Sequence, residues 1–154
     1  MDFLPALEAE NALSSLLNVY YREGEDADTP QETLDAFITY LRELLSKHLM
    51  NGLVAFEHDT PIGFVLYAVD ADGYPFSERP GMGTIAEISV VPAYREHGLG
   101  RRLVQQAEAA LCSSVTHLYV CAHRSAIGFW HACGYLPTED IASNGLALYI
   151  KQLK

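Results

Sequence analysis

The sequence has little positive charge. It contains 10 Lys and Arg residues against 20 Asp and Glu residues, a formal net charge of −10 over 154 residues, and no Lys/Arg-rich run. Binding to nucleic-acid phosphates needs a basic patch, so no nucleic-acid partner is expected. An acidic protein attracts cations, so its charge favours a cationic substrate such as an amine.

Cysteine is scarce as well, and long apolar runs are absent. The three cysteines (Cys112, Cys121, Cys133) are odd in number, lack a C-x-x-C spacing and have apolar neighbours, which predicts buried free thiols. No histidine has metal-ligand spacing, so no metal is predicted. The first twelve residues lack the basic region of a signal peptide, and no apolar run is long enough to cross a bilayer. We therefore predict a soluble cytoplasmic protein without membrane contact.

Apolar periodicity predicts the order of helices and strands. Helical spacing covers residues 3–22, and a second helix starts at Pro30, capped by Asp28 or Thr29, and ends near Asn51-Gly52. A hairpin of strands at 53–57 and 62–69 follows, and then an irregular insert rich in Gly and Pro at 70–83. The remaining elements are a strand at 84–91, a helix at 98–112, a strand at 117–122, a helix at 125–133 and strands near 137–141 and 146–152.

This order predicts one α/β domain spanning residues 1–154. Strands that alternate with helices in the second half imply parallel pairing there, with helices on the faces of the sheet. The first half supplies a helix pair and antiparallel strands. The expected architecture is therefore a mixed sheet with flanking helices.

The segment from Val90 to Leu103 carries the clearest chemical signal. A buried strand ends at Pro92, a short loop turns, and a helix begins at about Gly98. A helix N-terminus offers unpaired N–H groups and a positive dipole end, which together bind anions. Gly98 and Gly100 lack side chains, so a pyrophosphate can approach the backbone closely. Positive charge for the same phosphates is available from Arg95, and from Arg101 or Arg102.

Several interpretations of this turn compete. A P-loop requires a GKS or GKT ending, which is absent. A dinucleotide fingerprint requires a third glycine where Leu103 stands, and an acidic residue at the end of the next strand, where Ala122 and His123 stand. The R-x-x-G-x-G turn of acyl-CoA-binding proteins fits at every position. The alternative without function is a helix that simply begins with two glycines.

Two spaced motifs give the chain a resemblance to the GNAT superfamily of acetyl-CoA-dependent N-acetyltransferases. Residues 90–95 match the family's V-x-P-x-Y-R strand end, which precedes R-x-x-G-x-G. Residues 123–135 align with its N-x-x-A-x-x-F-Y-x-x-x-G-F pattern. The resemblance covers the chain from about Ile62 to the C-terminus. It implies a mixed sheet whose central parallel strands splay apart, and it includes relatives that often dimerise, so a homodimer is compatible with it.

The resemblance also implies acetyl-CoA as cofactor and a set of residues that bind it. Backbone of the strand end would hydrogen-bond the pantetheine arm and the acetyl carbonyl, the turn would bind the phosphates, and the downstream motif would complete the site. The expected cofactor residues are Ser89, Val90, Val91, Arg95, Glu96, His97, Gly98, Leu99, Gly100, Arg101, Arg102, His123, Ala126, Phe129 and Trp130.

Two residues depart from the family pattern. His123 stands in place of the family's Asn, where it can either bond to pantetheine or cap the helix start. Trp130 replaces the Tyr often proposed to protonate the departing thiolate. An indole N–H donates a hydrogen bond but delivers no proton at neutral pH. Trp130 therefore only stabilises the thiolate, or another group is the acid, or catalysis has been lost.

Glu87 is the candidate base. It lies in an otherwise apolar strand, three residues before the Val90 backbone that should meet the cofactor. A carboxylate there is costly unless it lies in a cleft or is paired. In relatives a Glu on this strand often acts as base or anchors the substrate ammonium; the alternative is a solvated Glu at a strand start.

The acceptor pocket is expected to use aromatic residues from two segments. Tyr20 and Tyr21 end the first helix, and Tyr74 and Phe76 lie in the insert. Ordinary surface packing is the alternative for all four. The leading hypothesis is an N-acetyltransferase that acetylates a primary amine, of a small molecule or a peptide, by direct attack in a ternary complex. The alternatives are a catalytically silent acyl-CoA-binding module and a nucleotide-binding α/β protein.

Overall fold

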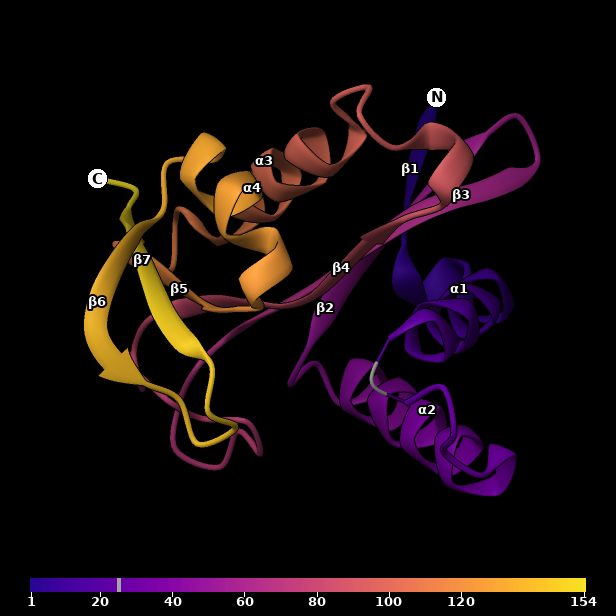
Figure 1. Ribbon diagram of the computed structural model, residues 1–154, viewed down its shortest axis with the longest axis horizontal. Helices are drawn as coiled ribbons and strands as arrows, with labels where there is room; N and C mark the ends of the chain where they lie inside the picture. The colour runs from indigo at the N-terminus through magenta and orange to yellow at the C-terminus, as the bar shows by residue number, and fades with distance from the viewer. Residues whose placement is uncertain (25) are drawn as a thin grey trace. The chain divides into compact units, whose positions relative to one another are not determined.

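The computed structural model describes residues 1–24 and 26–154, which form helices and strands in the order that Figure 1 labels. The chain divides into two compact units: residues 1–66 with 87–103 (unit 1), and residues 67–86 with 104–154 (unit 2). Strands β3 (Thr60–Val69) and β4 (Gly83–Val90) each contribute residues to both units. Whether residues 1–154 act as one domain stays a prediction.

Unit 1 combines antiparallel strands with a helix pair. Strand β1 (Asp2–Pro5) pairs antiparallel with β2 (Asn51–Glu57), with Asp2 opposite Phe56 and Pro5 opposite Leu53. Helices α1 (Glu10–Glu23) and α2 (Gln31–Ser46) lie side by side (Figure 1). Each buries one apolar face: Leu13, Leu16, Leu17 and Tyr21 on α1, and Leu34, Ile38, Leu41, Leu44 and Leu45 on α2.

The predicted helix over residues 3–22 is wrong in its first part. Residues 2–5 form β1, a short 3-10 helix η1 (Ala6–Glu8) follows, and α1 begins only at Glu10. Pro5 disfavours helical geometry at Leu4, the residue before it, so residues 3 and 4 favour an extended strand over a helix. Leu4 and Leu7, whose spacing suggested the helix, are exposed.

The second predicted helix is shorter than expected at both ends. Pro30 is the residue before α2, with an extended ψ of 140°, and no side chain caps the helix start. The helix ends at Ser46, and His48 adopts a φ of 58°, a left-handed geometry typical of helix termination. Asn51, expected at the helix end, is the first residue of β2.

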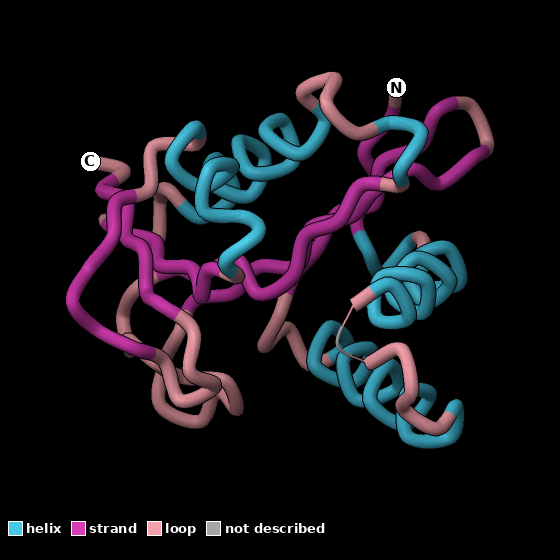
Figure 2. Tube along the Cα trace, in the orientation of Figure 1, coloured by secondary structure: helices cyan, strands magenta, loops and turns pink. Residues whose placement is uncertain are grey.

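Unit 2 contains the parallel pairing that the alternation predicted. The start of β4 pairs parallel with β5 (His117–Ala122) at Gly83–Leu118 and Thr84–Tyr119. β5 then pairs antiparallel with β7 (Ala147–Gln152) along its whole length, and β7 pairs with β6 (Leu136–Ile141). Figure 2 shows β6 and β7 joined by a short loop. The strand order is β1-β2-β3-β4-β5-β7-β6, which confirms the mixed sheet.

The helices of the second half match the predicted ones closely. η2 (Pro92–Tyr94) precedes α3 (Leu99–Leu111), and η3 (Arg124–Ala126) precedes α4 (Ile127–Ala132). The predicted burial of the cysteines is wrong for Cys112, which is exposed just beyond α3. Cys133 is buried and Cys121 is partly buried, and all three are free thiols.

The insert between β3 and β4 is organised around a buried carboxylate. Asp70 is fully buried, and its Oδ2 accepts hydrogen bonds from the backbone N–H groups of Glu78 (2.8 Å) and Arg79 (2.7 Å) and from the hydroxyl of Tyr119 (2.8 Å). Burial acts to raise the pKa of Asp70, but these bonds and one from Ser77 outweigh it and hold the pKa below its usual value. The carboxylate therefore fixes the insert against β5.

Candidate active site

Glu87 lies on β4 and is contacted by the C-terminal end of α1. The hydroxyl of Tyr21 donates a hydrogen bond to Glu87 Oε1 at 3.2 Å, and the side chain of Tyr20 also bonds to the carboxylate. Glu87 is half-buried, and all three residues belong to unit 1. The structure thus brings together the predicted base and two of the four predicted pocket residues.

The environment of Glu87 changes its proton affinity. Burial raises its pKa from 4.5 to about 7, and nearby Asp26 adds to the rise, whereas the bonds from Tyr20 and Tyr21 act against it. Burial, followed by the charge of Glu87, raises the pKa of Tyr21 well above its ordinary value, so its hydroxyl stays protonated and can donate. A carboxyl group with a pKa near neutrality can accept and release a proton at physiological pH, as a general base must.

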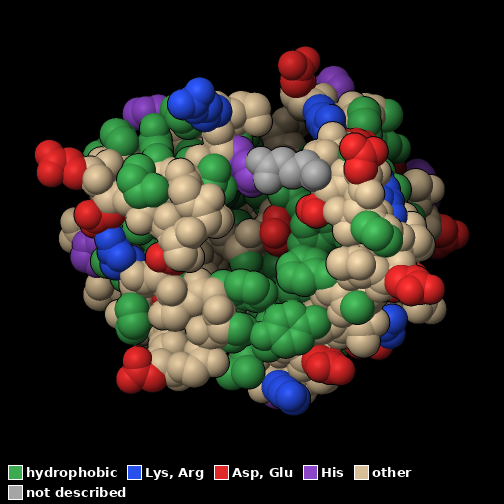
Figure 3. Space-filling model, turned by 60° about the horizontal axis from the view of Figure 1, so that its bottom comes forward, with side chains coloured by type: hydrophobic (Ala, Val, Ile, Leu, Met, Phe, Trp, Pro, Cys, Tyr) green, Lys and Arg blue, Asp and Glu red, His purple; other side chains and the backbone are tan. Residues whose placement is uncertain are grey.

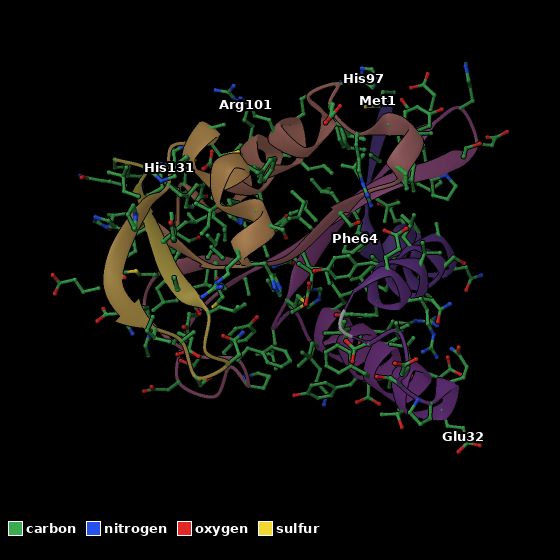
Figure 4. The ribbon with its side chains drawn as sticks, in the orientation of Figure 1. Met1, Glu32, Phe64, His97, Arg101 and His131 are labelled. Atoms are coloured by element: carbon green, nitrogen blue, oxygen red, sulfur yellow. The ribbon has the colours of Figure 1, made fainter. Side chains whose placement is uncertain are left out.

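Aromatic packing holds the two tyrosines in place. The ring of Tyr21 packs edge-to-face on Phe37 of α2, with centroids 5.5 Å apart, and the ring of Tyr20 packs in the same way on Phe64 of β3, at 5.9 Å. Figure 4 labels Phe64 where β3 passes α1. Edge-to-face pairs of this kind stabilise by roughly 0.5–1.5 kcal/mol beyond their buried area. The hydroxyl groups are therefore held by rings from α1, α2 and β3.

The turn before α3 exposes backbone N–H groups. Glu96 and Gly98 adopt left-handed φ angles of 65° and 84°, and the first helical hydrogen bond runs from the Arg102 N–H to the Gly98 carbonyl. The N–H groups of residues 99–101 precede that bond and have no partner within the helix. A Cβ at Gly98 would find no atom within 4 Å, so the space beside the turn is open. This geometry can hold an anion such as a diphosphate.

Gly63 on β3 is a residue that sequence reasoning missed. A Cβ there would lie 3.0 Å from the Ser89 carbonyl oxygen, 3.3 Å from Leu103 and 3.5 Å from Leu99. The glycine therefore lets the start of α3 pack closely on β3 and β4. An isolated glycine inside a strand pattern signals such a close backbone approach, and this signal was present in the sequence.

The basic residues of the turn have different partners. Arg95 donates through Nε to the Val90 carbonyl at 2.7 Å and through a terminal nitrogen to Glu23 at 3.0 Å. The guanidinium of Arg102 stacks on the ring of Phe3 in the N-terminal strand, 5.2 Å from the ring centroid. Arg101 and His97 are exposed, and their side chains point away from the strands in Figure 4. Arg101 is therefore the arginine most available to a phosphate at this turn.

Part of the backbone expected to contact the cofactor already forms hydrogen bonds. The N–H of Val91 donates to the Ile62 carbonyl at 2.9 Å, and the Val90 carbonyl accepts from Arg95. Ser89 and Val91 are half-buried, whereas Val90 is buried. A role for Ser89–Val91 in holding pantetheine stays a prediction.

The other two predicted pocket residues belong to unit 2. Tyr74 is buried and Phe76 is exposed, and their rings pack edge-to-face at 5.8 Å. Asp70, which fixes the insert that carries both rings, was not predicted. An Asp at a strand end before a Gly- and Pro-rich segment is a sequence signal for such loop anchoring.

The sequence profile of the Acetyltransferase (GNAT) family matches residues 11–135. The chain belongs to this family. The match spans most of the chain and includes Glu87 and the turn at Gly98, and no curated protein matches this GNAT chain by sequence.

Solved structures share the GNAT fold with this chain. A putative GNAT acetyltransferase from Desulfovibrio desulfuricans has a TM-score of 0.75 at 17% identity over 99% of both chains. PaiA N-acetyltransferase from Thermoplasma acidophilum, solved with coenzyme A, has a TM-score of 0.70 at 14% identity over 99% of both chains. An aminoglycoside 6'-N-acetyltransferase, also complexed with coenzyme A, has a TM-score of 0.72 at 13% identity over 100% of this chain and 98% of that one.

The downstream GNAT motif lies in unit 2. His123 occupies the N-cap position of η3, where its carbonyl accepts from the Ala126 N–H, but its exposed side chain makes no capping bond. Trp130 is only 5% exposed and packs between Phe129 and Tyr135, with ring centroids 5.1 and 5.2 Å away. Cofactor contacts by His123, Ala126, Phe129 and Trp130 stay predictions.

Three further findings concern the described residues of this GNAT chain. None of their helices has the length and apolar composition that a membrane span requires. No three of their His, Cys, Asp or Glu side chains gather as metal ligands would. On the face that Figure 3 displays, acidic and basic side chains are scattered rather than gathered into one patch.

Proposed function

We propose that this GNAT chain is an N-acetyltransferase that transfers the acetyl group of acetyl-CoA to a primary amine by direct attack in a ternary complex. The observation that carries the proposal is the half-buried Glu87, bonded to Tyr21 and with a pKa of about 7, on the strand that leads into the turn at Gly98. An acceptor ammonium is attracted by this carboxylate and must lose a proton to become a nucleophile.

The turn before α3 fits the phosphates of coenzyme A. The N–H groups of residues 99–101 are unpaired within the helix, the side of Gly98 is open, and Arg101 is exposed beside them. Two similar structures, PaiA N-acetyltransferase and an aminoglycoside 6'-N-acetyltransferase, contain coenzyme A. Acetyl-CoA, when bound, supplies the activated thioester, and the chain's own residues orient the acceptor and move its proton.

Glu87 performs the proton transfer in this proposal. Its ionised carboxylate takes a proton from the acceptor ammonium, directly or through one water. The neutral amine nitrogen then forms its bond to the acetyl carbon while the carbon–sulfur bond breaks. The sulfur retains the bonding electron pair and leaves as thiolate. The second amine proton goes to that thiolate or to solvent, and Glu87 returns its own proton to solvent. Because the pKa of Glu87 is about 7, we expect the rate to fall as pH drops below 7.

Thermal unfolding with acetyl-CoA, CoA, NAD and ATP in parallel tests the cofactor. A ligand at a hundred times its dissociation constant stabilises by about 2.7 kcal/mol, which raises the midpoint by roughly 5–10 °C. We expect a shift with acetyl-CoA and CoA only, followed by amine-dependent thiol release in a screen of primary amines. A shift with NAD or ATP instead would contradict the acetyl-CoA site.

A pair of glycine variants separates cofactor binding from backbone strain. Gly98 and Gly145 share a φ of 84°, and neither would bring a Cβ within 4 Å of another atom. Gly98→Glu places a bulky anion at the phosphate turn, whereas Gly145→Glu introduces similar strain in the loop before β7. We expect only Gly98→Glu to abolish the acetyl-CoA shift and the thiol release.

One observation favours a second candidate function, a silent acyl-CoA-binding module. Trp130 stands where the family has a Tyr, and it is buried among aromatic rings. Binding of CoA without thiol release on any amine would support this alternative over the enzyme.

A further inference from the structure

The last turn of α1 is bonded to several parts of unit 1. Three consecutive residues bond to different parts of unit 1: Tyr21 to Glu87, Arg22 to the following loop, and Glu23 to Arg95. We propose that Tyr21 is a positioning residue for Glu87, held by this turn so that its hydroxyl keeps the carboxylate ionised and aimed at the acceptor. The inference rests on the proposed acetyltransferase function.

The geometry around Tyr21 leaves its hydroxyl little freedom. Its ring is buried against Phe37, and its hydroxyl reaches Glu87 Oε1 at 3.2 Å. Because the pKa of Tyr21 is raised, the hydroxyl remains a donor throughout the neutral range. A hydrogen bond to an ionised carboxylate favours the charged form. Tyr21 therefore opposes the burial that would otherwise keep Glu87 protonated.

Neighbouring contacts fix the helical turn that carries Tyr21. On one side, Arg22 donates to the carbonyls of Asp26 (3.0 Å) and Ala27 (3.1 Å), which ties the loop after α1 to the helix. On the other side, Glu23 pairs with Arg95, which also bonds to the Val90 carbonyl at the end of β4. Both β4 and the turn before α3 are thus linked to the same helix end.

The groups that face Glu87 are few. Tyr20 and Tyr21 from α1 stabilise its charged form, and Asp26 from the loop after α1 destabilises it. Phe37 and Phe64, which pack on the tyrosines from α2 and β3, carry no charge. Within the part of the chain that the structure describes, no Lys, Arg or His forms an ion pair with Glu87. The tyrosine hydroxyls are thus the groups that keep Glu87 ionised.

The test is Tyr21→Phe, which removes the hydroxyl and keeps the ring. We expect the pKa of Glu87 to move upward by roughly 1–2 units, the effect of losing one hydrogen bond to a charged group. The acid limb of the kcat/KM profile should move by the same amount, so the loss of rate relative to wild type should be largest at low pH and smallest at pH 9, where Glu87 is ionised in both proteins. A merely structural role would lower the rate equally at every pH.

The matched control is Tyr135→Phe, which removes a tyrosine hydroxyl from Glu108 in unit 2. It should leave the acid limb unmoved. A direct titration of the Glu87 carboxyl by NMR, with Glu87→Gln identifying its signal, reports the shift without any turnover. An unchanged Glu87 pKa in Tyr21→Phe would overturn the inference even if the enzyme is active. Absence of thiol release by the wild-type protein would instead contradict the proposed function, and the titration would still decide the role of Tyr21.

Discussion

Two tyrosine–glutamate pairs, one in each unit, differ in what surrounds the carboxylate. In unit 1, Tyr21 donates to Glu87 at 3.2 Å; in unit 2, Tyr135 donates to Glu108 at 2.9 Å. Glu108 also forms an ion pair with Lys151 at 3.0 Å, and Lys151 bonds to the Cys133 carbonyl as well. Within the described residues Glu87 has no such cation, and the charged side chain that acts on its pKa is another acid, Asp26.

The difference separates a structural carboxylate from one suited to chemistry. The charge of Glu108 is balanced, so the group ties β7 and the end of α4 to α3. Burial of Glu87 without a cation raises its pKa to about 7, which costs stability at neutral pH and creates a group that exchanges protons there. Proteins tolerate such a cost mainly where function requires it.

The largest expected effect is on catalysis. Glu87→Gln removes the base and should lower kcat/KM by about 10²–10⁴-fold, equivalent to roughly 3–5 kcal/mol of barrier, without loss of fold stability. Glu108→Gln should keep the wild-type kcat/KM but lower the unfolding midpoint. Steady-state thiol release and urea denaturation of both variants measure this contrast. Equal losses of kcat/KM in Glu87→Gln and Glu108→Gln would show that the two carboxylates do not differ in their catalytic role.

The next effect is the pH dependence of stability. Folded Glu87 has a pKa of about 7 against 4.5 for the free side chain, so the folded state binds this proton more tightly. Glu87 therefore adds at most about 3 kcal/mol to the free energy of unfolding. This contribution is fully present below pH 4.5 and is lost as pH rises through 7. Relative to Glu87→Gln, the wild type should therefore lose stability between pH 5 and 8. The test is the free energy of urea unfolding of both proteins at several pH values. The same pH dependence in the two proteins would contradict the raised pKa.

Removing Lys151 should leave Glu108 without a cation, as Glu87 is. Lys151 and Glu108 have side-chain exposures of 28% and 12%, so Lys151→Met should destabilise the protein by about 1–2 kcal/mol at pH 7. Lys47→Met, at an exposed position after α2, is the control. Denaturant midpoints of the two variants at pH 7 measure the loss, and equal midpoints for Lys151→Met and Lys47→Met would show that the ion pair contributes no stability.

The smallest effect is expected for Tyr135→Phe. It removes one hydrogen bond to Glu108 while Lys151 remains, so the cost should be about 1 kcal/mol. Differential scanning calorimetry measures the loss. A larger destabilisation than that of Lys151→Met would show that the hydroxyl, and not the cation, dominates this pair.

The local elements of the second half were predictable from the sequence. β5 was predicted at its observed bounds, and α3 differs from prediction by one residue at each end, because apolar periodicity and the glycines at 98 and 100 specify these elements locally. The family followed from the same motifs. The first half was less predictable: Pro5 and its pairing with β2 turned the expected helix start into a strand, and strand pairing depends on distant residues.

The strand–turn–helix at Gly98, and the unusual position of a charged Glu87 in an apolar strand, could both be identified from local sequence. The groups that surround that charge come from tertiary contacts. Tyr21 lies 66 residues before Glu87, and Glu23, which pairs with Arg95, lies 72 residues before it. Backbone motifs are encoded by neighbouring residues, whereas burial and hydrogen bonding, which set the pKa of a carboxyl group, come from elements that meet only in the folded chain.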